Sequence, residues 1–321
     1  MDKTVVVTEY VDSAGLELLR AQVRLFYLPD STGVHLSDVI AEAHGLGVRL
    51  ARITPDLLDA ATHLQVIAKH GVGVDNIDVA AATARRIPVV TTPGANSTSV
   101  AEHILSMILC LANRICAADS ALKSGRFRSR EDYVGVELRG KTLGVVGMGR
   151  IGSETARMAR LGFGMDVCYF DPMLLANAPG DTDGYRRLSG LDELLCQADF
   201  VVLCLPLTAE TSGVVGAHEL SLMKPTAYLV NTSRGGLVDE DALCDALANG
   251  QIAGAGADAF VQEPVPSDHP LLRMENFIAT PHVGGATREA MTRMSTDMAE
   301  EILRVLQGEQ PHHAVNPEVL S

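Results

Sequence analysis

The chain lacks the features that mark membrane-spanning and nucleic-acid-binding proteins. No uninterrupted apolar run reaches the ~18 residues that suggest a membrane span. Its 26 Lys and Arg residues are outnumbered by 40 Asp and Glu residues, and they form no basic block. Because clustered Lys and Arg bind the phosphate backbone, nucleic acid is not an expected partner.

Cysteine is also scarce, and its spacing carries no framework. The six cysteines form no CxxC pair, and most lie in apolar stretches. They predict reduced thiols rather than a disulfide frame or a zinc site, and no metal is expected. The N-terminus enters a strand-like run at once, without the basic and apolar regions of a signal peptide. These features predict a cytoplasmic location.

The remaining composition is that of a globular α/β protein. The chain has 321 residues, of which 47% are hydrophobic and 21% charged, and this length favours two domains. Short β-branched runs alternate with longer helical patterns, which is typical of parallel sheets built from βαβ units. We therefore expect two doubly wound parallel sheets.

The alternation can be divided into elements. In the first third, strands are expected at Thr4–Thr8, Val48–Ala51, Val66–Lys69 and Val89–Thr91, with helices at Ala14–Arg20, Leu36–Ala43, Thr54–Ala61 and Asn76–Arg85. A long helix is expected from Ser97 to about Ala121.

The later strands are almost wholly apolar, as in a sheet covered by helices on both faces. They are expected at Leu143–Val146, Val167–Phe170, Phe200–Leu203, Ala227–Val230, Ala255–Asp258 and Phe277–Ala279. The last helix is expected from Thr287 to Gln307, and the tail Glu309–Ser321 is expected to lie extended over the surface.

A glycine-rich turn follows the first of these apolar strands. Gly147, Gly149 and Gly152 fit the G-x-G-x-x-G pattern, and Arg150 and Ile151 open the helix that follows. In a dinucleotide-binding turn the first glycine permits the bend, the second admits the pyrophosphate, and the third lets helix and strand pack closely. The sequence therefore predicts a dinucleotide site.

An acidic residue then indicates which dinucleotide is bound. Asp171 lies about 20 residues beyond the turn, at the end of the next expected strand, as the fingerprint requires. Its carboxylate would accept hydrogen bonds from the ribose hydroxyls and repel a 2′-phosphate. No arginine adjoins it, because Pro172 and Met173 follow. NAD is therefore expected rather than NADP.

Three further segments resemble the signatures of the D-isomer-specific 2-hydroxyacid dehydrogenases. They are Asn231–Glu240, Gly256–Phe260 with Glu263 and Pro264, and Thr280–Gly285. The segments Lys69–Asp78 and Thr92–Ser97 resemble the phosphoglycerate-dehydrogenase-like branch. The resemblance extends over nearly the whole chain.

The resemblance implies a Rossmann cofactor domain inserted into a flavodoxin-like substrate domain. The substrate domain would comprise residues 1–98 and 287–321, and the NAD-binding domain residues 99–286. The implied activity is hydride transfer between NAD and a 2-hydroxy acid of D-type geometry.

The resemblance also implies three catalytic residues. Arg234 would bind the substrate carboxylate and the C2 oxygen through its planar fork of donors. His282 would give a proton to the carbonyl oxygen during reduction and remove it during oxidation. Glu263 would orient the imidazole and stabilise its charged form.

Further residues are carried over as binding residues. The expected cofactor-binding set is Gly147, Gly149, Arg150, Ile151, Gly152, Asp171, Leu205, Pro206, Thr211, Thr232, Ser233, Asp258, Gly284 and Gly285. Asp258 resembles the residue that fixes the nicotinamide carboxamide. The N–H groups of Val72 and Gly73 are expected to hold the substrate carboxylate, together with Arg234 and His282.

Basic residues near Val72 and Gly73 are candidate ligands of a second anionic group on the substrate. Arg49, Arg52 and Lys69 lie near expected strand ends, where they could bind a distal phosphate or sulfonate. Ordinary solvated charges are the alternative. Phosphoglycerate enzymes commonly carry Arg and Thr where this chain has Lys69 and Val72, which weakens the case for phosphoglycerate itself.

The resemblance leaves two other functions open. A formate-dehydrogenase-like enzyme would carry Gln in place of Glu263, and an NAD-sensing corepressor would retain the triad without turnover.

A homodimer is expected by resemblance, through the helix after Ser97 and the polar arm Lys123–Tyr133. The histidines His70, His103 and His218 are interpreted as structural, and His312 and His313 as part of a solvated tail.

Overall fold

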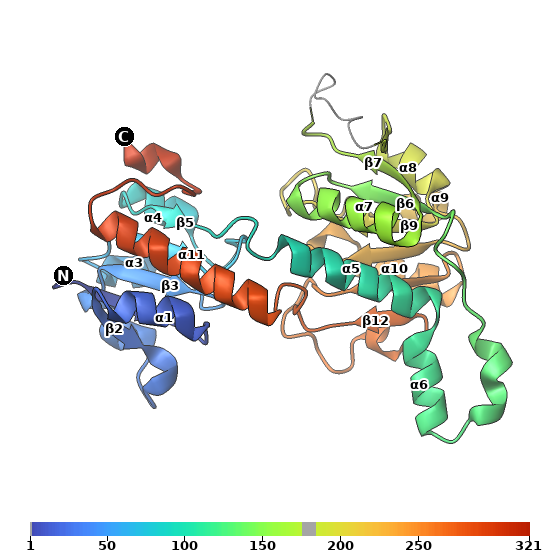
Figure 1. Cartoon of the computed structure of the whole chain (residues 1–321), viewed down its shortest axis with the longest axis horizontal. Helices are drawn as coiled ribbons and strands as arrows, with labels where there is room; N and C mark the ends of the chain where they lie inside the picture. The colour runs from blue at the N-terminus through green and yellow to red at the C-terminus, as the bar shows by residue number, and fades with distance from the viewer. Residues whose placement is uncertain (1, 175–183) are drawn as a thin grey trace. The chain divides into compact units, whose positions relative to one another are not determined.

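The computed structural model describes residues 2–174 and 184–321 of the chain. The chain divides into two compact units, one formed by Met1–Asn96 with Ala286–Ser321 and the other by Ser97–Gly285. Each unit is an α/β domain with its own sheet, and its elements can be followed in Figure 1.

The first unit is built on a five-stranded parallel sheet with the order β2-β1-β3-β4-β5. The strands are β1 (Thr4–Val7), β2 (Arg24–Tyr27), β3 (Gly45–Val48), β4 (Val66–Lys69) and β5 (Val89–Val90). The helices are α1 (Ser13–Arg20), α2 (Leu36–Val39), α3 (Pro55–Ala60), α4 (Val79–Ala84) and α11 (Arg288–Leu306). This strand order is that of flavodoxin-like domains, so the predicted fold of this unit is confirmed.

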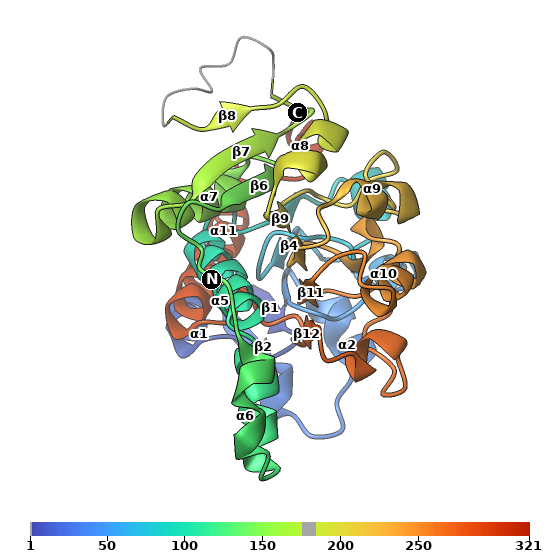
Figure 2. The same ribbon diagram turned by 90° about the vertical axis from the view of Figure 1, so that its right-hand side faces the viewer.

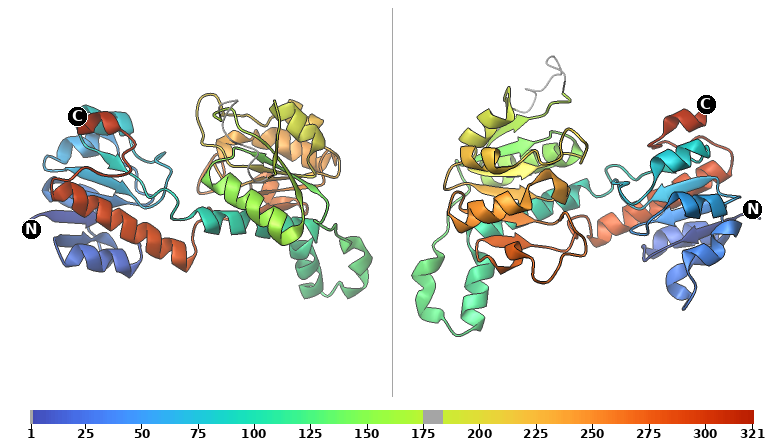
Figure 3. Two further views of the ribbon diagram at one scale, coloured as in Figure 1. Left: turned by 45° about the horizontal axis from the view of Figure 1, so that its top comes forward. Right: turned by 180° about the vertical axis from the view of Figure 1, so that it is seen from behind.

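Alternate residues of the strands supply the two apolar layers of the first unit. In β1, Val5 and Val7 pack in one cluster with α1 and α11, while Val6 packs in the other. Figure 3 shows α11 lying along the sheet of this unit. Both faces of the sheet are therefore covered, which explains its apolar strands.

The third strand lies earlier than predicted. It spans Gly45–Val48 and not Val48–Ala51, because α11 packs directly on its glycines. A Cβ at Gly45 would lie 2.8 Å from the Ile302 side chain, and one at Gly47 would lie 3.1 Å from Met298. The glycines that disfavour a strand locally are thus what lets the final helix approach.

The second unit contains a seven-stranded parallel sheet with the order β12-β11-β10-β9-β6-β7-β8. The strands are β6 (Thr142–Val146), β7 (Asp166–Phe170), β8 (Arg186–Arg187), β9 (Phe200–Leu203), β10 (Tyr228–Asn231), β11 (Gly254–Ala257) and β12 (Phe277–Ala279). When the strands are numbered from β6 along the chain and read from β8, their order is 3-2-1-4-5-6-7. This is the doubly wound dinucleotide-binding order 3-2-1-4-5-6 with one strand added. The predicted Rossmann-type fold is confirmed.

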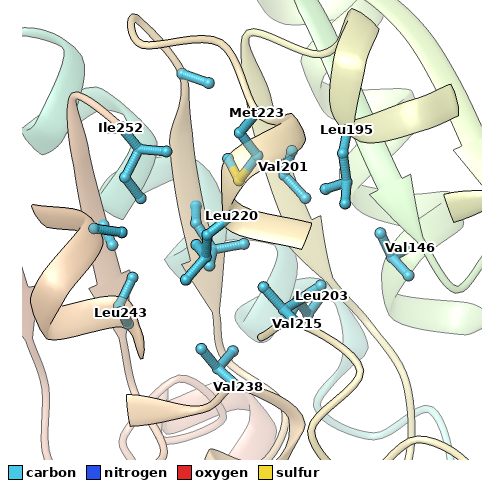
Figure 4. Packing of buried hydrophobic residues seen from close by; sticks show 14 of the residues in the cluster. Val146, Leu195, Val201, Leu203, Val215, Leu220, Met223, Val238, Leu243 and Ile252 are labelled. Atoms are coloured by element: carbon cyan, nitrogen blue, oxygen red, sulfur yellow. The ribbon is translucent and has the colours of Figure 1, made fainter. Parts of the chain in front are cut away.

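Helices cover both faces of this sheet, as Figure 2 shows. They are α5 (Ser97–Ala112), α6 (Ile115–Lys123), α7 (Arg150–Phe163), α8 (Leu191–Gln197), α9 (Ala217–Leu222) and α10 (Glu240–Ala248). Val145 packs with α5 and α7, whereas the next residue, Val146, packs with α8, α9 and α10. Figure 4 shows the second of these clusters, with Leu195, Leu220 and Leu243 brought together over the sheet.

The long helix predicted from Ser97 to Ala121 is interrupted. α5 ends at Ala112 and α6 begins at Ile115, bent by 60°, with Arg114 in the left-handed region at a φ of 51°. The backbone N–H of Val136 donates to the carbonyl oxygen of Ala112 at 2.9 Å, so the returning chain occupies the helix end. Tertiary packing, and not a local breaker, ends this helix.

The tail is also more ordered than predicted. Ala314 forms an antiparallel bridge with Val90, and Asn316 is 1% exposed. The Asn316 side chain accepts from the N–H of Val89 at 2.8 Å and donates to the carbonyl oxygen of Ile87 at 3.0 Å. The predicted surface-lying tail is therefore corrected to a docked segment.

Two strands were missed in the sequence. β2 carries partly exposed residues, and β8 has only two residues, so neither shows an apolar run. Among the described residues no single helix is long and apolar enough to cross a membrane, although the bent pair α5 and α6 together meets that length and composition.

Candidate active site

The turn between β6 and α7 has the geometry of a phosphate-binding loop. Gly147 adopts a φ of 95°, and a Cβ there would lie 2.6 Å from the carbonyl oxygen of Cys204. A Cβ at Gly152 would lie 2.0 Å from the carbonyl oxygen of Gly147, so glycine is needed for α7 to approach the turn. At Gly149 a Cβ would meet no heavy atom within 4 Å in the described part of the chain. The backbone at Gly149 is therefore open to a ligand.

The start of α7 completes this loop. The helix begins at Arg150, with Ile151 in the same turn, and no side chain of the described residues caps its N-terminal N–H groups. Uncapped N–H groups and the positive end of the helix dipole favour an anion. The loop thus fits the pyrophosphate of a dinucleotide.

Asp171 lies beside the turn, at the end of β7. Its Oδ2 accepts from the N–H of Met148 at 2.8 Å, and its Oδ1 accepts from the N–H of Met173 at 2.9 Å. Each oxygen keeps a lone pair that would accept a ribose hydroxyl. The carboxylate therefore shapes the turn as well as offering the acceptor that the fingerprint requires.

Several other expected cofactor residues follow β9 and β10. Thr211 donates its hydroxyl to the carbonyl oxygen of Pro206 at 2.7 Å, and Ser233 donates its hydroxyl to that of Leu203 at 2.8 Å. Leu205 is buried beside the turn. The Thr232 hydroxyl is buried and has no hydrogen-bond partner in residues 2–174 and 184–321. A buried hydroxyl without a partner suits a site that a ligand completes.

Arg234 lies just after β10, in a turn that the neighbouring chain fixes. The Asn231 side chain donates to the carbonyl oxygen of Arg234 at 2.8 Å and accepts from the N–H of Ser233 at 3.0 Å. A Cβ at Gly235 would lie 2.0 Å from the carbonyl carbon of Phe260, so the turn touches the segment after β11. One guanidinium nitrogen, Nη1, donates to the carbonyl oxygen of Ser233 at 2.7 Å.

Glu263 and His282 form a direct pair. Nδ1 of His282 lies 3.1 Å from Oε1 and 3.0 Å from Oε2 of Glu263. Oε1 also accepts from the N–H of Phe260 at 3.1 Å, which holds the carboxylate in place. The two side chains are 45% and 40% exposed, so the pair is reachable from solvent. Since Nδ1 faces Glu263, Nε2 of His282 is the nitrogen left to exchange a proton.

The backbone directly after His282 is bound to Asp258. Oδ1 of Asp258 accepts from the N–H of Val283 at 2.9 Å, and Oδ2 accepts from the N–H of Gly284 at 2.8 Å. Thr280 donates its hydroxyl to Oδ1 at 2.5 Å. Burial raises the pKa of Asp258, but hydrogen bonds from His103, Thr280 and the two N–H groups outweigh it and hold the pKa below its usual range.

Sequence reasoning missed the supports of this loop. His103 keeps its structural interpretation, and its partner is Thr280, 3.0 Å away. Glu240 ends the first of the three signature segments, but the resemblance gave it no role. Its Oε1 accepts from the N–H of Val261 at 2.8 Å, and its Oε2 lies 3.2 Å from His269. Only the tertiary structure reveals these contacts, since the partners are distant in sequence.

The remaining expected residues belong to the first unit. Val72 is 48% exposed and precedes the half-buried Gly73. Nζ of Lys69 donates to the carbonyl oxygen of Arg49 at 2.6 Å and to Oδ1 of Asn76 at 2.5 Å. These two bonds give Lys69 a part in holding the segment of Arg49.

The segment after β3 has a second support. The Glu9 carboxylate accepts from the backbone N–H groups of residues 49–51.

Next to Lys69, His70 is 4% exposed, and its Nε2 has no hydrogen-bond partner among the described residues. Burial and the charge of Arg49 lower the pKa of His70 to about 4, so its ring is neutral near pH 7.

One other group of potential ligands lies at the surface of the second unit. Asp192, His218 and Glu219 place possible metal-binding atoms within 4.8 Å of one another. Glu219 already accepts from the N–H of Gly216 at 3.0 Å. Asp192 and His218 are exposed, so this group has no buried ligand to favour an ion over water.

A family model matches most of the second unit. Residues 105–284 match the model described as D-isomer specific 2-hydroxyacid dehydrogenase, NAD binding domain. The match spans the glycine-rich turn, Arg234, Glu263 and His282.

Curated relatives extend the similarity over the whole chain. A D-3-phosphoglycerate dehydrogenase of Methanocaldococcus jannaschii is 40% identical over 97% of this chain, which spans 59% of that protein. A glyoxylate reductase of Korarchaeum cryptofilum is 37% identical over 100% of this chain and 98% of its own length. This chain thus spans little more than half of the first relative and nearly all of the second.

A solved structure agrees with the fold. The TT0316 protein of Thermus thermophilus has a TM-score of 0.87 and 37% identity, covering 97% of this chain and 99% of its own.

Proposed function

Because this chain belongs to the D-isomer-specific 2-hydroxyacid dehydrogenase family, we propose that it is an NAD-dependent enzyme that interconverts a 2-hydroxy acid and its 2-oxo acid. The contact between His282 Nδ1 and the Glu263 carboxylate supports this most directly. A histidine held by a carboxylate transfers one proton to or from an oxygen of the substrate. Arg234 and the dinucleotide turn belong to the same unit.

Each of the three side chains has a distinct task. His282 donates a proton from Nε2 to the carbonyl oxygen during reduction, and it accepts that proton from the hydroxyl during oxidation. Glu263 orients the ring and stabilises the imidazolium. Arg234 binds the carboxylate and polarises the C2 oxygen through its planar donors. When bound, the nicotinamide cofactor supplies or accepts the hydride.

The substrate class is narrower than the reaction class. The N–H groups of Val72 and Gly73 remain the predicted ligands of the substrate carboxylate. We propose Arg49 and Arg52 as ligands of a distal phosphate or sulfonate, because both are basic residues in an acidic chain. Lys69 supports Arg49 through its carbonyl oxygen, so we assign Lys69 to the scaffold of this site.

A panel of 2-oxo acids with NADH tests the reaction. Glyoxylate, pyruvate and hydroxypyruvate would be compared with 3-phosphohydroxypyruvate and sulfopyruvate, and NADH absorbance followed. We expect turnover of at least one acid and its loss, by about 100-fold or more, in His282→Gln. The matched control His218→Gln changes an exposed histidine outside the proposed site. Absence of turnover across the panel would remove the enzyme assignment.

The same panel tests the distal anion. If Arg49 and Arg52 bind it, the phosphate or sulfonate acids have the lower KM, and Arg52→Gln raises that KM while leaving glyoxylate unaffected. Equal KM values for acids with and without the distal group would show that Arg49 and Arg52 are ordinary solvated charges.

The alternatives receive less support. The relatives described above are named as a dehydrogenase and a reductase, and Glu263 occupies the position where a formate dehydrogenase would carry Gln. A corepressor-like binding protein would retain the triad and bind NADH without turnover, so the panel separates it from an enzyme.

We also propose that the chain forms a homodimer through α6 and the arm that follows it. Ile115, Leu122, Phe127 and Val134 are 49%, 59%, 67% and 77% exposed in this part of the second unit. Clustered exposed apolar side chains are typical of interfaces. Leu122→Asp should convert a dimer to a monomer in sedimentation equilibrium, while Leu161→Asp, at a residue 73% exposed on α7, should not. A wild-type monomer would refute the dimer.

A further inference from the structure

The backbone of His282 lies in a conformation that needs support. Its φ is 54°, in the left-handed region that residues other than glycine seldom adopt. A residue of this kind persists when its surroundings determine the conformation, since the strain costs on the order of 1–3 kcal/mol. The N–H groups of Val283 and Gly284, directly after His282, both donate to Asp258. Asp258 is therefore the support of the left-handed turn.

Asp258 is in turn supported from α5. Oγ1 of Thr280 lies 2.5 Å from Oδ1 of Asp258, and Nε2 of His103 lies 3.0 Å from the same Oγ1. His103 Nε2 is also 3.6 Å from Oδ1 of Asp258, whose side chain is 2% exposed. The three groups thus form a compact triangle, with the two short contacts meeting at Thr280.

Counting protons assigns the donor in each of the two short contacts. Asp258 is ionised and has no proton to give, so the single hydroxyl proton of Thr280 goes to the carboxylate. Oγ1 of Thr280 then accepts from His103, which must carry a proton on Nε2. The proton donors therefore run from His103 to Thr280 and from Thr280 to Asp258.

The ring of His103 is also packed in place. A Cβ at Gly284 would lie 3.3 Å from Cδ2 of His103 and 2.9 Å from Oδ2 of Asp258. The chain after His282 therefore packs against both His103 and Asp258, so we expect a change at either residue to alter the conformation of the turn.

We propose that His103 is a positioning residue that holds His282 in its left-handed conformation through Thr280 and Asp258. His103 touches neither substrate nor cofactor in this role; it donates to Thr280 and completes the bonding of a buried carboxylate. The catalytic part of the proposal rests on the proposed function, in which His282 transfers the proton, whereas the support of the turn does not.

Two pairs of variants separate bonding from packing. His103→Leu and Thr280→Val remove the donor or the hydroxyl and keep an apolar side chain. His103→Gln and Thr280→Ser keep a donor and a hydroxyl in a different shape. If bonding matters, the second member of each pair recovers what the first one loses.

Hydrogen exchange of the segment after His282 gives a readout that needs no turnover. Peptides covering Val283 and Gly284 should exchange at least about tenfold faster in His103→Leu and Thr280→Val, because bonds to a charged acceptor are weakened. The Gln and Ser variants should stay within about threefold of the wild-type rate, as should the surface control His218→Gln. Equal exchange in His103→Leu and the wild type would overturn the proposal.

Kinetics measure the consequence for His282. With the 2-oxo acid that the wild type reduces best, kcat should fall about 10- to 100-fold in His103→Leu. KM for the 2-oxo acid should stay within about threefold, because Arg234 is untouched, whereas KM for NADH is no control, since Asp258 and Gly284 are expected cofactor residues. A uniform loss in KM and kcat, or a Thr280→Ser variant as damaged as Thr280→Val, would indicate a packing role and overturn the proposal.

The two proposals fail differently. If the wild type reduces no 2-oxo acid, the proposed function fails, and the exchange rates still decide whether His103 supports the turn. If His103→Leu does not fold, the pair at Thr280 decides. If turnover is found and the exchange rates do not change, only the role of His103 is lost.

Discussion

Gly235 lies so close to Phe260 that a Cβ on Gly235 would fall 2.0 Å from the carbonyl carbon of Phe260. The turn that carries Arg234 is thereby fixed against the segment that leads to Glu263. We expect Gly235→Ala to cost about 1–3 kcal/mol of unfolding free energy, because the two backbones must separate. Urea unfolding would measure this loss.

A matched glycine shows whether the effect is local. At Gly162, in α7, a Cβ would meet no heavy atom within 4 Å of the described chain. Gly162→Ala should be neutral, or stabilising by up to about 1 kcal/mol, because alanine favours a helix. Equal behaviour of the two variants would contradict the close approach at Gly235.

Arg234 offers a test of bidentate binding. Arg234→Lys keeps the charge but loses the planar fork, so kcat/KM should fall by about 10- to 100-fold, the equivalent of about 1.5–3 kcal/mol. Steady-state kinetics with the best 2-oxo acid would measure it. Arg157→Lys, in an exposed pair with Glu154, should change kcat/KM little. Near wild-type kinetics in Arg234→Lys would show that the reaction does not need bidentate binding by Arg234.

Asp171 should set the choice between NAD and NADP. Its carboxylate repels a 2′-phosphate, so Asp171→Ser should lower the ratio of kcat/KM for NADH over NADPH by about tenfold or more. The change also removes acceptors for the N–H groups of Met148 and Met173, so activity with NADH should fall. Asp166→Ser, at the opposite end of β7, should leave the ratio unchanged. A wild-type preference for NADPH would overturn the assignment.

His70 predicts a pH dependence of stability. Its pKa is about 4 in the folded chain and 6.5 as the ordinary value, so the unfolded chain binds the extra proton between these values. Stability from this residue is therefore present above pH 6.5 and is lost as the pH falls toward 4. The loss between pH 7 and pH 5 is about 2 kcal/mol.

His70→Gln isolates this contribution, because Gln does not titrate. The difference in unfolding free energy between wild type and variant should shift by that amount between pH 7 and pH 5, measured by urea unfolding. A difference that stays constant over this range would show that His70 titrates normally in the folded chain.

Much of the fold follows from patterns that are local in sequence. Phe200–Leu203 and Phe277–Ala279 match the structure residue for residue, because apolar runs between turn residues define buried strands. The errors arise where distant packing overrides the local pattern. The third strand forms at Gly45–Val48 because α11 packs against its glycines. α5 ends at Ala112, where the N–H of Val136 donates to the carbonyl oxygen.

The candidate site divides in the same way. Family motifs predict Arg234, Glu263 and His282 as the catalytic residues, and the structure brings the last two into contact. No sequence signal linked His103 to Thr280, which lies 177 residues away, and no motif revealed that Lys69 binds the carbonyl oxygen of Arg49. Motifs predict the reacting groups, whereas the contacts that surround them depend on how the elements pack.

The docked C-terminal segment has a consequence for solubility. β5 is the last strand of the five-stranded sheet, and an uncovered strand of this kind is a template for pairing with another molecule. The segment occupies that position: the N–H of Thr91 donates to the carbonyl oxygen of His313, and the N–H of Val315 donates to that of Val89. Residues that a motif search ignores thus protect the protein against edge-to-edge aggregation.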